Sequence, residues 1–265
     1  MSSLASFDEV RRLDLGFFVR PAAETGTGQP RVEAVYSYLV VHPEITVIFD
    51  TGIGSADPET EAHYQPHRRP LDLACREVGS SIEMIDVVVN SHLHFDHCGA
   101  NPSLAGRRIV AQSAELDAAH GEQYTFRELI DFNGAIYDRI DGEAEIANGL
   151  VVLPTPGHSP GHQSLVIRTR DGTLLVAGQA MDFSAIGLGS GGSCASAYAS
   201  AHLARRASHE LGRPLAVWPD WLDRIEQFDE SLSRVVDDKS HSGCDGPGVF
   251  VGVGGLLPRL IAPFL

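Results

Sequence analysis

The decisive stretch of this chain is Ser91-His92-Leu93-His94-Phe95-Asp96-His97-Cys98-Gly99, in which three histidines and an aspartate fall within six residues. Imidazole nitrogens and carboxylate oxygens are good ligands for zinc and neighbouring divalent ions. Alternate side chains of an extended chain point the same way, so His92 and His94 can bind one ion together. A turn after them would let Asp96 and His97 face a second ion. With 12 histidines in 265 residues, chance produces this spacing in about one such chain in a thousand, so a metal site is favoured over ordinary surface or core histidines.

The segments before this cluster have the pattern of strands that lead into it. Residues 85–89 form a short apolar run, which is typical of a strand buried on both faces. Residues 35–41 and 45–49 predict a hairpin that ends at Asp50-Thr51-Gly52, and residues 71–78 predict a helix that stops near Gly79. Since active sites of layered α/β proteins gather at strand ends, the position of the histidines directly after a buried strand favours a functional site.

The segments after the cluster continue the alternation of strands and helices. We expect strands at 109–111, 150–153, 165–168 and 173–176, the last two joined by the hairpin signal Asp171-Gly172. We expect helices at 113–120, 195–211 and 221–228. Residues 121–148 are polar and weakly periodic and are interpreted as an insertion or lid-like segment. The pattern predicts one α/β domain over residues 1–265, built as a layered sandwich.

A further histidine lies where a loop can turn it toward the cluster. His158 follows Pro156-Gly157 at the end of the strand predicted for 150–153. Taken alone it would be an ordinary turn histidine, but beside His92 and His94 it becomes the natural third ligand of one ion. His162 is a weaker candidate, with a supporting or structural role.

Composition limits the classes of partner. The formal net charge is −15 and the sequence pI is about 5.1, so nucleic acid and anionic lipid surfaces are disfavoured and neutral substrates are favoured over anionic ones. No apolar window is long enough for a membrane span, and the first residues lack the pattern of a signal peptide. The four cysteines form no C-x-x-C pair and are expected to be reduced thiols. These features predict a cytoplasmic protein.

Three motifs resemble the metallo-β-lactamase superfamily, and within it most closely the N-acyl homoserine lactonase branch. They are HLHFDH at 92–97, DTG at 50–52 and TPGHSPGHQS at 155–164, and the resemblance extends over residues 35–182. It implies a four-layer αββα sandwich and a dinuclear zinc site. By position in the motifs, His92, His94 and His158 would hold one zinc ion, and Asp96 and His97 the other.

Two positions depart from the pattern that the resemblance implies. The family places a bridging aspartate where this chain has Gln179, within Gly178-Gln179-Ala180. A neutral amide binds divalent ions less well than a carboxylate, so the second ion should be weaker or lost. Asp182 is a possible substitute for the missing charge. The family also ends its site with a histidine near the C-terminus, for which His241 is the candidate. We therefore expect one or two zinc ions per chain.

The function that the resemblance implies is hydrolysis of a small neutral lactone or ester, with N-acyl homoserine lactone first among the substrates. A water molecule activated by the metal would attack the carbonyl, while Asp96 anchors an ion and helps to handle the proton. Aromatic residues between 121 and 148 suit an acyl lactone but are equally compatible with ordinary packing; they are Tyr124, Phe126, Phe132 and Tyr137. Two alternatives remain open, namely a thioesterase or other ester hydrolase, and a non-catalytic homologue with a degraded second metal site.

Overall fold

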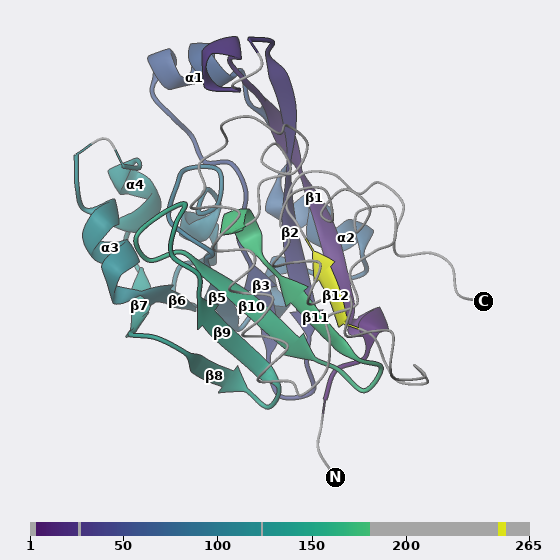
Figure 1. Ribbon diagram of the computed structural model, residues 1–265. Helices are drawn as coiled ribbons and strands as arrows, with labels where there is room; N and C mark the ends of the chain where they lie inside the picture. Colours follow the sequence, from purple (N-terminus) through teal and green to yellow (C-terminus); the bar gives the residue numbers. More distant parts are fainter. Residues whose placement is uncertain (1–3, 26–27, 123, 181–248, 253–265) are drawn as a thin grey trace, which may run out of the picture.

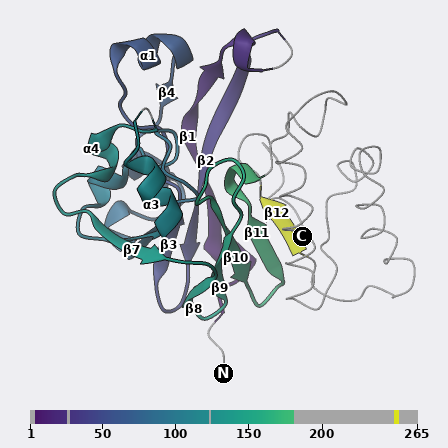
Figure 2. The same ribbon diagram turned by 60° about the vertical axis from the view of Figure 1, so that its left-hand side comes forward.

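Two β-sheets lie face to face in the computed structural model, which describes residues 4–25, 28–122, 124–180 and 249–252 of the chain (Figure 1). The first sheet has seven strands in the order β4-β1-β2-β3-β5-β6-β7, and the second has five in the order β12-β11-β10-β9-β8. Figure 2, turned by 60°, shows the second sheet packed along the first, with α3 and α4 on the far side of the first sheet.

The strands of the first sheet are β1 (Val10–Arg20), β2 (Arg31–Val41), β3 (Thr46–Phe49), β4 (His67–Arg68), β5 (Val87–Val89), β6 (Arg108–Gln112) and β7 (Ile136–Ile140). Those of the second sheet are β8 (Ala144–Ala147), β9 (Leu150–Pro154), β10 (Gln163–Arg168), β11 (Thr173–Val176) and β12 (Val249–Gly252). The α-helices are α1 (Pro58–Tyr64), α2 (Leu71–Glu77), α3 (Ser113–Ala119) and α4 (Arg127–Ile130). Short 3-10 helices are η1 (Phe7–Glu9), η2 (Ala22–Glu24), η3 (Ile82–Met84), η4 (Asn101–Leu104) and η5 (Gly178–Ala180).

A core between the two sheets holds the sandwich together. Val47, Val87 and Val110 of the first sheet belong to the same buried cluster as Val152 and Leu165 of the second. Burial of each such side chain stabilises the fold by roughly 1.5–3 kcal/mol before the loss of chain entropy is counted. β3, β5, β6 and β7 run parallel, so their carboxyl ends meet at one edge of the first sheet.

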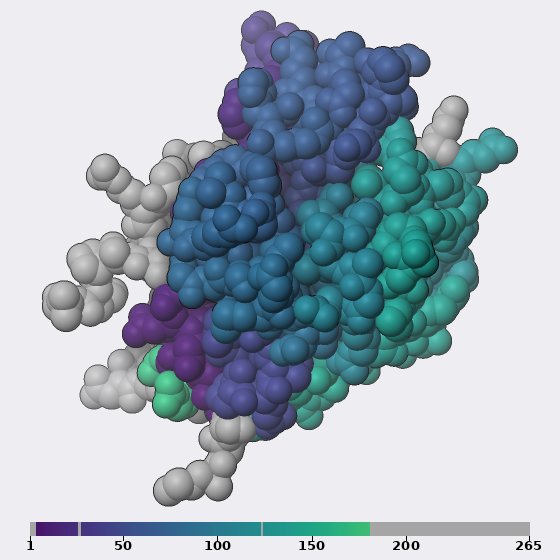
Figure 3. Space-filling view, turned by 180° about the vertical axis from the view of Figure 1, so that it is seen from behind, coloured from purple at the N-terminus to yellow at the C-terminus, as the bar shows by residue number. Residues whose placement is uncertain are grey.

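Helices cover the outer face of the first sheet. Leu71, Ala74 and Cys75 of α2 pack in one core cluster with Leu13 of β1 and Ile48 of β3. Seen from behind, the blue residues around α1 and α2 and the teal residues around α3 and α4 form one continuous surface (Figure 3). The helices predicted for 195–211 and 221–228 lie outside the described residues.

Most of the predicted elements are confirmed. The hairpin β2–β3 ends at Asp50, and β10 and β11 pair antiparallel around Asp171-Gly172. Helix α2 ends shortly before Gly79, which has a φ of 74°. The 109–111 strand and the helix after it are β6 and α3. Ser113 is the first residue of that helix, whose N-cap is Gln112.

The prediction for residues 121–148 needs a correction in its second half. β7 is the edge strand of the seven-stranded sheet and β8 is the edge strand of the five-stranded sheet, so 136–147 connects the two sheets instead of forming an insertion. Edge strands bury only part of their surface, which explains why their apolar alternation is weak in the sequence. In the part before them, Tyr124 and Phe126 line a cavity.

Among the described residues, none of the helices has the length and apolar character required to span a membrane.

Candidate metal centre

Four loops meet at one edge of the sandwich and carry the residues of the site. They follow β3 at Asp50, β5 at Asn90, β9 at Thr155 and β11 at Ala177. Backbone hydrogen bonds join them: Thr51 N–H donates to His97 O at 2.8 Å, and Gln163 N–H donates to Ser91 O at 2.8 Å. The site is therefore built from both sheets, and its geometry depends on how the sheets pack.

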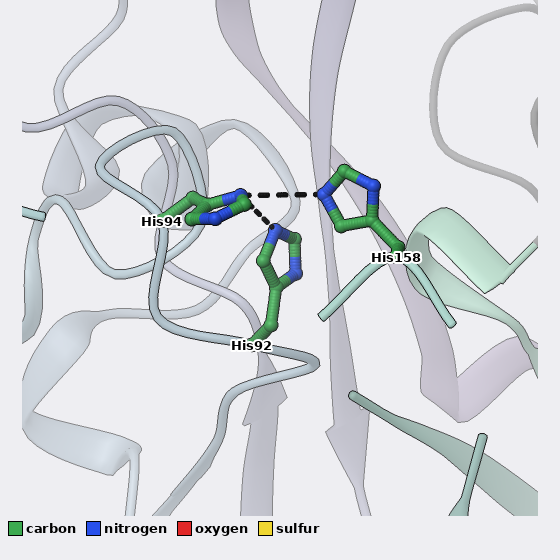
Figure 4. A group of neighbouring side chains, drawn as sticks. All are labelled: His92, His94 and His158. Carbon is green, nitrogen blue, oxygen red and sulfur yellow. Dashed lines mark hydrogen bonds between the residues drawn. The ribbon is translucent and has the colours of Figure 1, made fainter. Parts of the chain in front are cut away.

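Three histidines converge as the sequence predicts. His92 Nε2 lies 3.0 Å from His94 Nδ1, and His158 Nε2 lies 3.2 Å from the same atom (Figure 4). One nitrogen of each ring falls within 4.8 Å of the other two. Burial, followed by the neighbouring His97, lowers the pKa of His92 well below its usual value. Burial and then His94 lower the pKa of His158 to about 4. Both rings are therefore neutral near pH 7, the form in which imidazole binds a metal.

Asp96 and His97 lie together beside this group, as predicted. Asp96 Oδ2 is 3.3 Å from His97 Nε2, and the other ring nitrogen of His97 is 2.8 Å from Asp50 Oδ2. Burial alone would lower the pKa of His97, but the two carboxylates outweigh it and raise the pKa to about 10. Burial alone would raise the pKa of Asp96, yet His97 outweighs it and holds that pKa well below its usual range. Asp96 is therefore ionised at neutral pH.

Asp50 is a supporting residue for which the sequence analysis assigned no role. Its Oδ1 accepts Ser91 N–H at 2.6 Å, and its Oδ2 accepts Ser91 Oγ–H at 2.8 Å as well as the hydrogen bond from His97. The residue has a φ of 62°, in the left-handed region that aspartate tolerates better than most side chains. The partners of this aspartate lie more than 40 residues away along the chain, so no local signal in the sequence reveals them.

Gln179 lies at the site, at the start of the chain that follows β11. Its backbone N–H donates to His162 Nε2 at 3.1 Å, and His162 Nδ1 in turn bonds Thr155 Oγ1 at 2.8 Å. His162 is fully buried and makes both of these contacts with its ring nitrogens. The side-chain oxygen Oε1 of Gln179 is buried and has no hydrogen-bond partner within the described part of the chain. A buried polar atom without a partner is costly, and a cation beside it would supply one.

A cavity of about 430 Å³ opens over these groups. It is lined by the candidate site residues His94, Asp96, His158 and Gln179. Four further polar residues also line it, namely Arg20, Asp57, Thr60 and Thr125. Five aromatic residues complete the wall, namely Phe18, Tyr64, Phe95, Tyr124 and Phe126. Of the four aromatic residues expected near the substrate, Tyr124 and Phe126 therefore line the cavity, whereas Phe132 and Tyr137 pack against the core of the first sheet.

The remaining two predicted ligands, Asp182 and His241, lie outside the described residues. The residues that the structure does place fit a divalent transition ion. Three neutral imidazole nitrogens form a donor set typical of zinc, and the Asp96 carboxylate lies at the same cavity. Gln179 offers an oxygen that has no partner among the described residues.

Comparison with known proteins agrees with this geometry. A family model described as the metallo-beta-lactamase superfamily matches residues 30–210. An N-acyl homoserine lactonase of Bacillus cereus is 34% identical over 158 residues, which cover 54% of this chain and 61% of the relative. The N-acyl homoserine lactonase AiiB of Agrobacterium fabrum is 26% identical over 186 residues, covering 60% of this chain and 67% of the relative. The aligned region thus spans less than two thirds of the length of the Bacillus cereus relative.

Solved structures share the fold. The crystal structure of a quorum-quenching N-acyl homoserine lactone lactonase superposes with a TM-score of 0.62 at 24% identity and covers 95% of this chain and 93% of that one. The structure of AidC, a dizinc quorum-quenching lactonase, has a TM-score of 0.52 at 20% identity and covers 65% of this chain and 71% of that one. At these identities the likeness concerns the fold.

Proposed function

This chain belongs to the metallo-beta-lactamase superfamily, and on that premise we propose that it is a zinc-dependent hydrolase that opens the ring of N-acyl homoserine lactones. The observation that carries the proposal is the convergence of His92, His94 and His158, with one nitrogen of each ring within 4.8 Å of the others. Two of these rings, His94 and His158, line a cavity large enough for an acyl lactone. The similarity to curated N-acyl homoserine lactonases supports the choice of substrate.

We assign the first zinc ion to the three histidines. Asp96 and His97 would hold a second ion, whose binding would displace the proton that His97 carries in the metal-free protein. Gln179 would contribute a neutral oxygen where a carboxylate would bind more strongly. A bound zinc ion supplies a Lewis acid that polarises a carbonyl group and makes water a stronger nucleophile at neutral pH. Asp96, ionised and on the cavity wall, can accept a hydrogen bond from water or from the alcohol that ring opening releases.

The cavity suits a neutral substrate with an apolar tail. Within the described residues, Arg20 is the cation that lines it, and its guanidinium is bound to the Glu33 carboxylate by hydrogen bonds of 2.7 and 2.8 Å. Its charge is therefore offset within the protein. Aromatic rings from three separate parts of the chain, represented by Phe18, Phe95 and Phe126, offer an apolar surface for an acyl chain.

The test is turnover of a substrate panel by zinc-loaded protein whose metal content is measured by elemental analysis. We expect acyl homoserine lactones to be hydrolysed faster than a thioester or a nitrophenyl ester. His94→Ala should lose zinc and turnover together, whereas His67→Ala, an exposed histidine of β4 outside the cavity wall, should retain both.

Other outcomes would replace the proposal. A thioester hydrolysed faster than every lactone would make the protein a thioesterase. Zinc binding without turnover of any panel member would favour a non-catalytic homologue. Absence of zinc in protein supplied with the metal would contradict the metal centre itself.

A further inference from the structure

Glu115 is a buried carboxylate that the proposed reaction does not use. It lies in the first turn of α3, and only 1% of its surface is exposed. A buried carboxylate is costly unless donors surround it, so its partners show what it does in the fold.

Four donors from three segments converge on this carboxylate. Oε1 accepts Leu93 N–H at 2.8 Å and a short hydrogen bond from the Tyr124 hydroxyl. Oε2 accepts Ser159 Oγ–H at 2.6 Å and Gly161 N–H at 3.1 Å. Leu93 stands between His92 and His94, and Ser159 follows His158. One oxygen therefore holds the loop of the first two histidines, and the other holds the loop of the third.

The approach of the second loop to α3 gives independent evidence that the contact is built into the chain. A Cβ atom at Gly161 would lie 2.2 Å from the backbone nitrogen of Glu115 and 2.5 Å from its Cβ. Real Cβ atoms do not approach other atoms so closely, so only glycine lets the His158 loop rest on the helix at this position.

We propose that Glu115 is the positioning residue that sets His158 against His92 and His94, and thereby sets the affinity of the three-histidine site for its metal ion. The inference rests on the proposed function for the identity of that metal. Tyr124 connects the same carboxylate to the cavity: its ring centroid lies 4.6 Å from that of His94, and its hydroxyl donates to Glu115. The carboxylate thus joins both histidine loops and one wall of the cavity.

An amide cannot replace the carboxylate. In Glu115→Gln, one of the two oxygens becomes an NH₂ group that donates instead of accepting. The two hydroxyl partners can rotate and accept from it, but the backbone N–H of Leu93 or of Gly161 would then face another donor. The variant can therefore hold one histidine loop or the other, although its side chain has nearly the same volume.

The experiment compares zinc dissociation constants, measured by competition with a chromophoric chelator, and the visible absorption spectra of the cobalt-substituted proteins. For Glu115→Gln we expect zinc binding about 10–100-fold weaker and an altered cobalt spectrum, because supporting residues of metal ligands have effects of this size. Gly161→Ala should act in the same direction. Ser159→Ala removes one hydroxyl donor, keeps both backbone contacts and should weaken zinc binding by a smaller factor.

A matched control separates positioning from loss of stability. Leu150→Ala truncates a fully buried side chain in the core between the sheets, away from both histidine loops. It should lower the melting temperature while the zinc affinity and the cobalt spectrum stay those of the wild type. If Glu115→Gln behaves like this control, the proposal is overturned; if Glu115→Gln does not fold, unchanged zinc affinity in Ser159→Ala and Gly161→Ala overturns it.

The outcomes also separate this inference from the proposed function. Wild-type protein that binds zinc but hydrolyses no lactone would end the lactonase proposal, while weaker zinc binding in Glu115→Gln would still support the positioning role. Lactone hydrolysis by the wild type together with unchanged zinc affinity in Glu115→Gln would support the lactonase proposal and overturn the positioning role.

Discussion

Gln179 presents a neutral oxygen at a cavity wall that also contains Asp96 and His158. Among the residues that the structure describes, this oxygen is buried without a hydrogen-bond partner, while the backbone of Gln179 is fixed by its hydrogen bond to the buried His162 ring. The hydrogen bond that fixes this residue comes from its main chain and does not depend on its side chain. A substitution here can therefore change the charge of the side chain without removing that contact. The strength of the second metal site should depend on that charge.

We expect Gln179→Asp to increase the affinity for a second zinc ion by about ten-fold or more, since a carboxylate supplies the negative charge that divalent ions prefer. Titration calorimetry and elemental analysis would measure the affinity and the number of ions. Gln179→Asn is the matched control, with the same length as aspartate and no charge. Equal second-ion affinities in the two variants would contradict our interpretation of this position.

Two of the loops at the site, those after β3 and β5, are in close backbone contact with each other. Gly99 N–H donates to Gly52 O at 2.8 Å, and Gly54 N–H donates to Phe95 O at 2.7 Å. A Cβ atom at Gly99 would lie 2.0 Å from the nitrogen of Gly54. The loop after β5 therefore rests directly on the loop after β3, and this contact brings Asp50 to His97.

Gly99→Ala should lower the free energy of unfolding by about 3 kcal/mol, because backbone atoms on both loops must shift to admit the methyl group. Urea denaturation monitored by circular dichroism would measure it. Gly79→Ala is the control: Gly79 has a φ of 74° with no atom within 4 Å of an added Cβ, so it should cost only the backbone strain of about 1–2 kcal/mol. Similar losses in the two variants would show that the contact between the loops is not tight.

At the scale of the whole molecule, the packing of two sheets encloses several histidines and removes them from water. His92 and His162 are both fully buried, and burial lowers the pKa of each well below its usual value. The folded protein keeps these rings neutral at a pH at which the unfolded chain would protonate them. The stability of the metal-free protein is therefore linked to pH.

The metal-free protein should lose stability as the pH falls from about 6.5 to about 5, by up to about 1.4 kcal/mol per pH unit for each such histidine. His97 does not offset this loss. Its pKa is raised to about 10, so its contribution is fully present below about pH 6.5 and disappears only as the pH rises toward 10. Urea denaturation of chelator-treated protein across this range is the measurement, and His162→Gln should show a shallower slope. A flat profile in the wild type would contradict the prediction.

The sequence by itself determined many of the strands and helices and the first candidate metal ligands, because both are encoded locally. The buried strand at β5, the hairpin that ends at Asp50, the hairpin around Gly172, and the spacing of His92, His94, Asp96 and His97 are all readable within a few residues. The metallo-β-lactamase resemblance rested on the same short motifs.

Only the tertiary structure decided several of the contacts between residues that are far apart in the sequence. Asp50 is 47 residues from His97, and Glu115 reaches partners 22 and 46 residues away. The edge strands β7 and β8 likewise take their conformation from the neighbours with which they pair. Hydrogen bonds and close contacts of this kind leave no periodicity in the chain, because they depend on how two sheets pack and not on which residues follow one another.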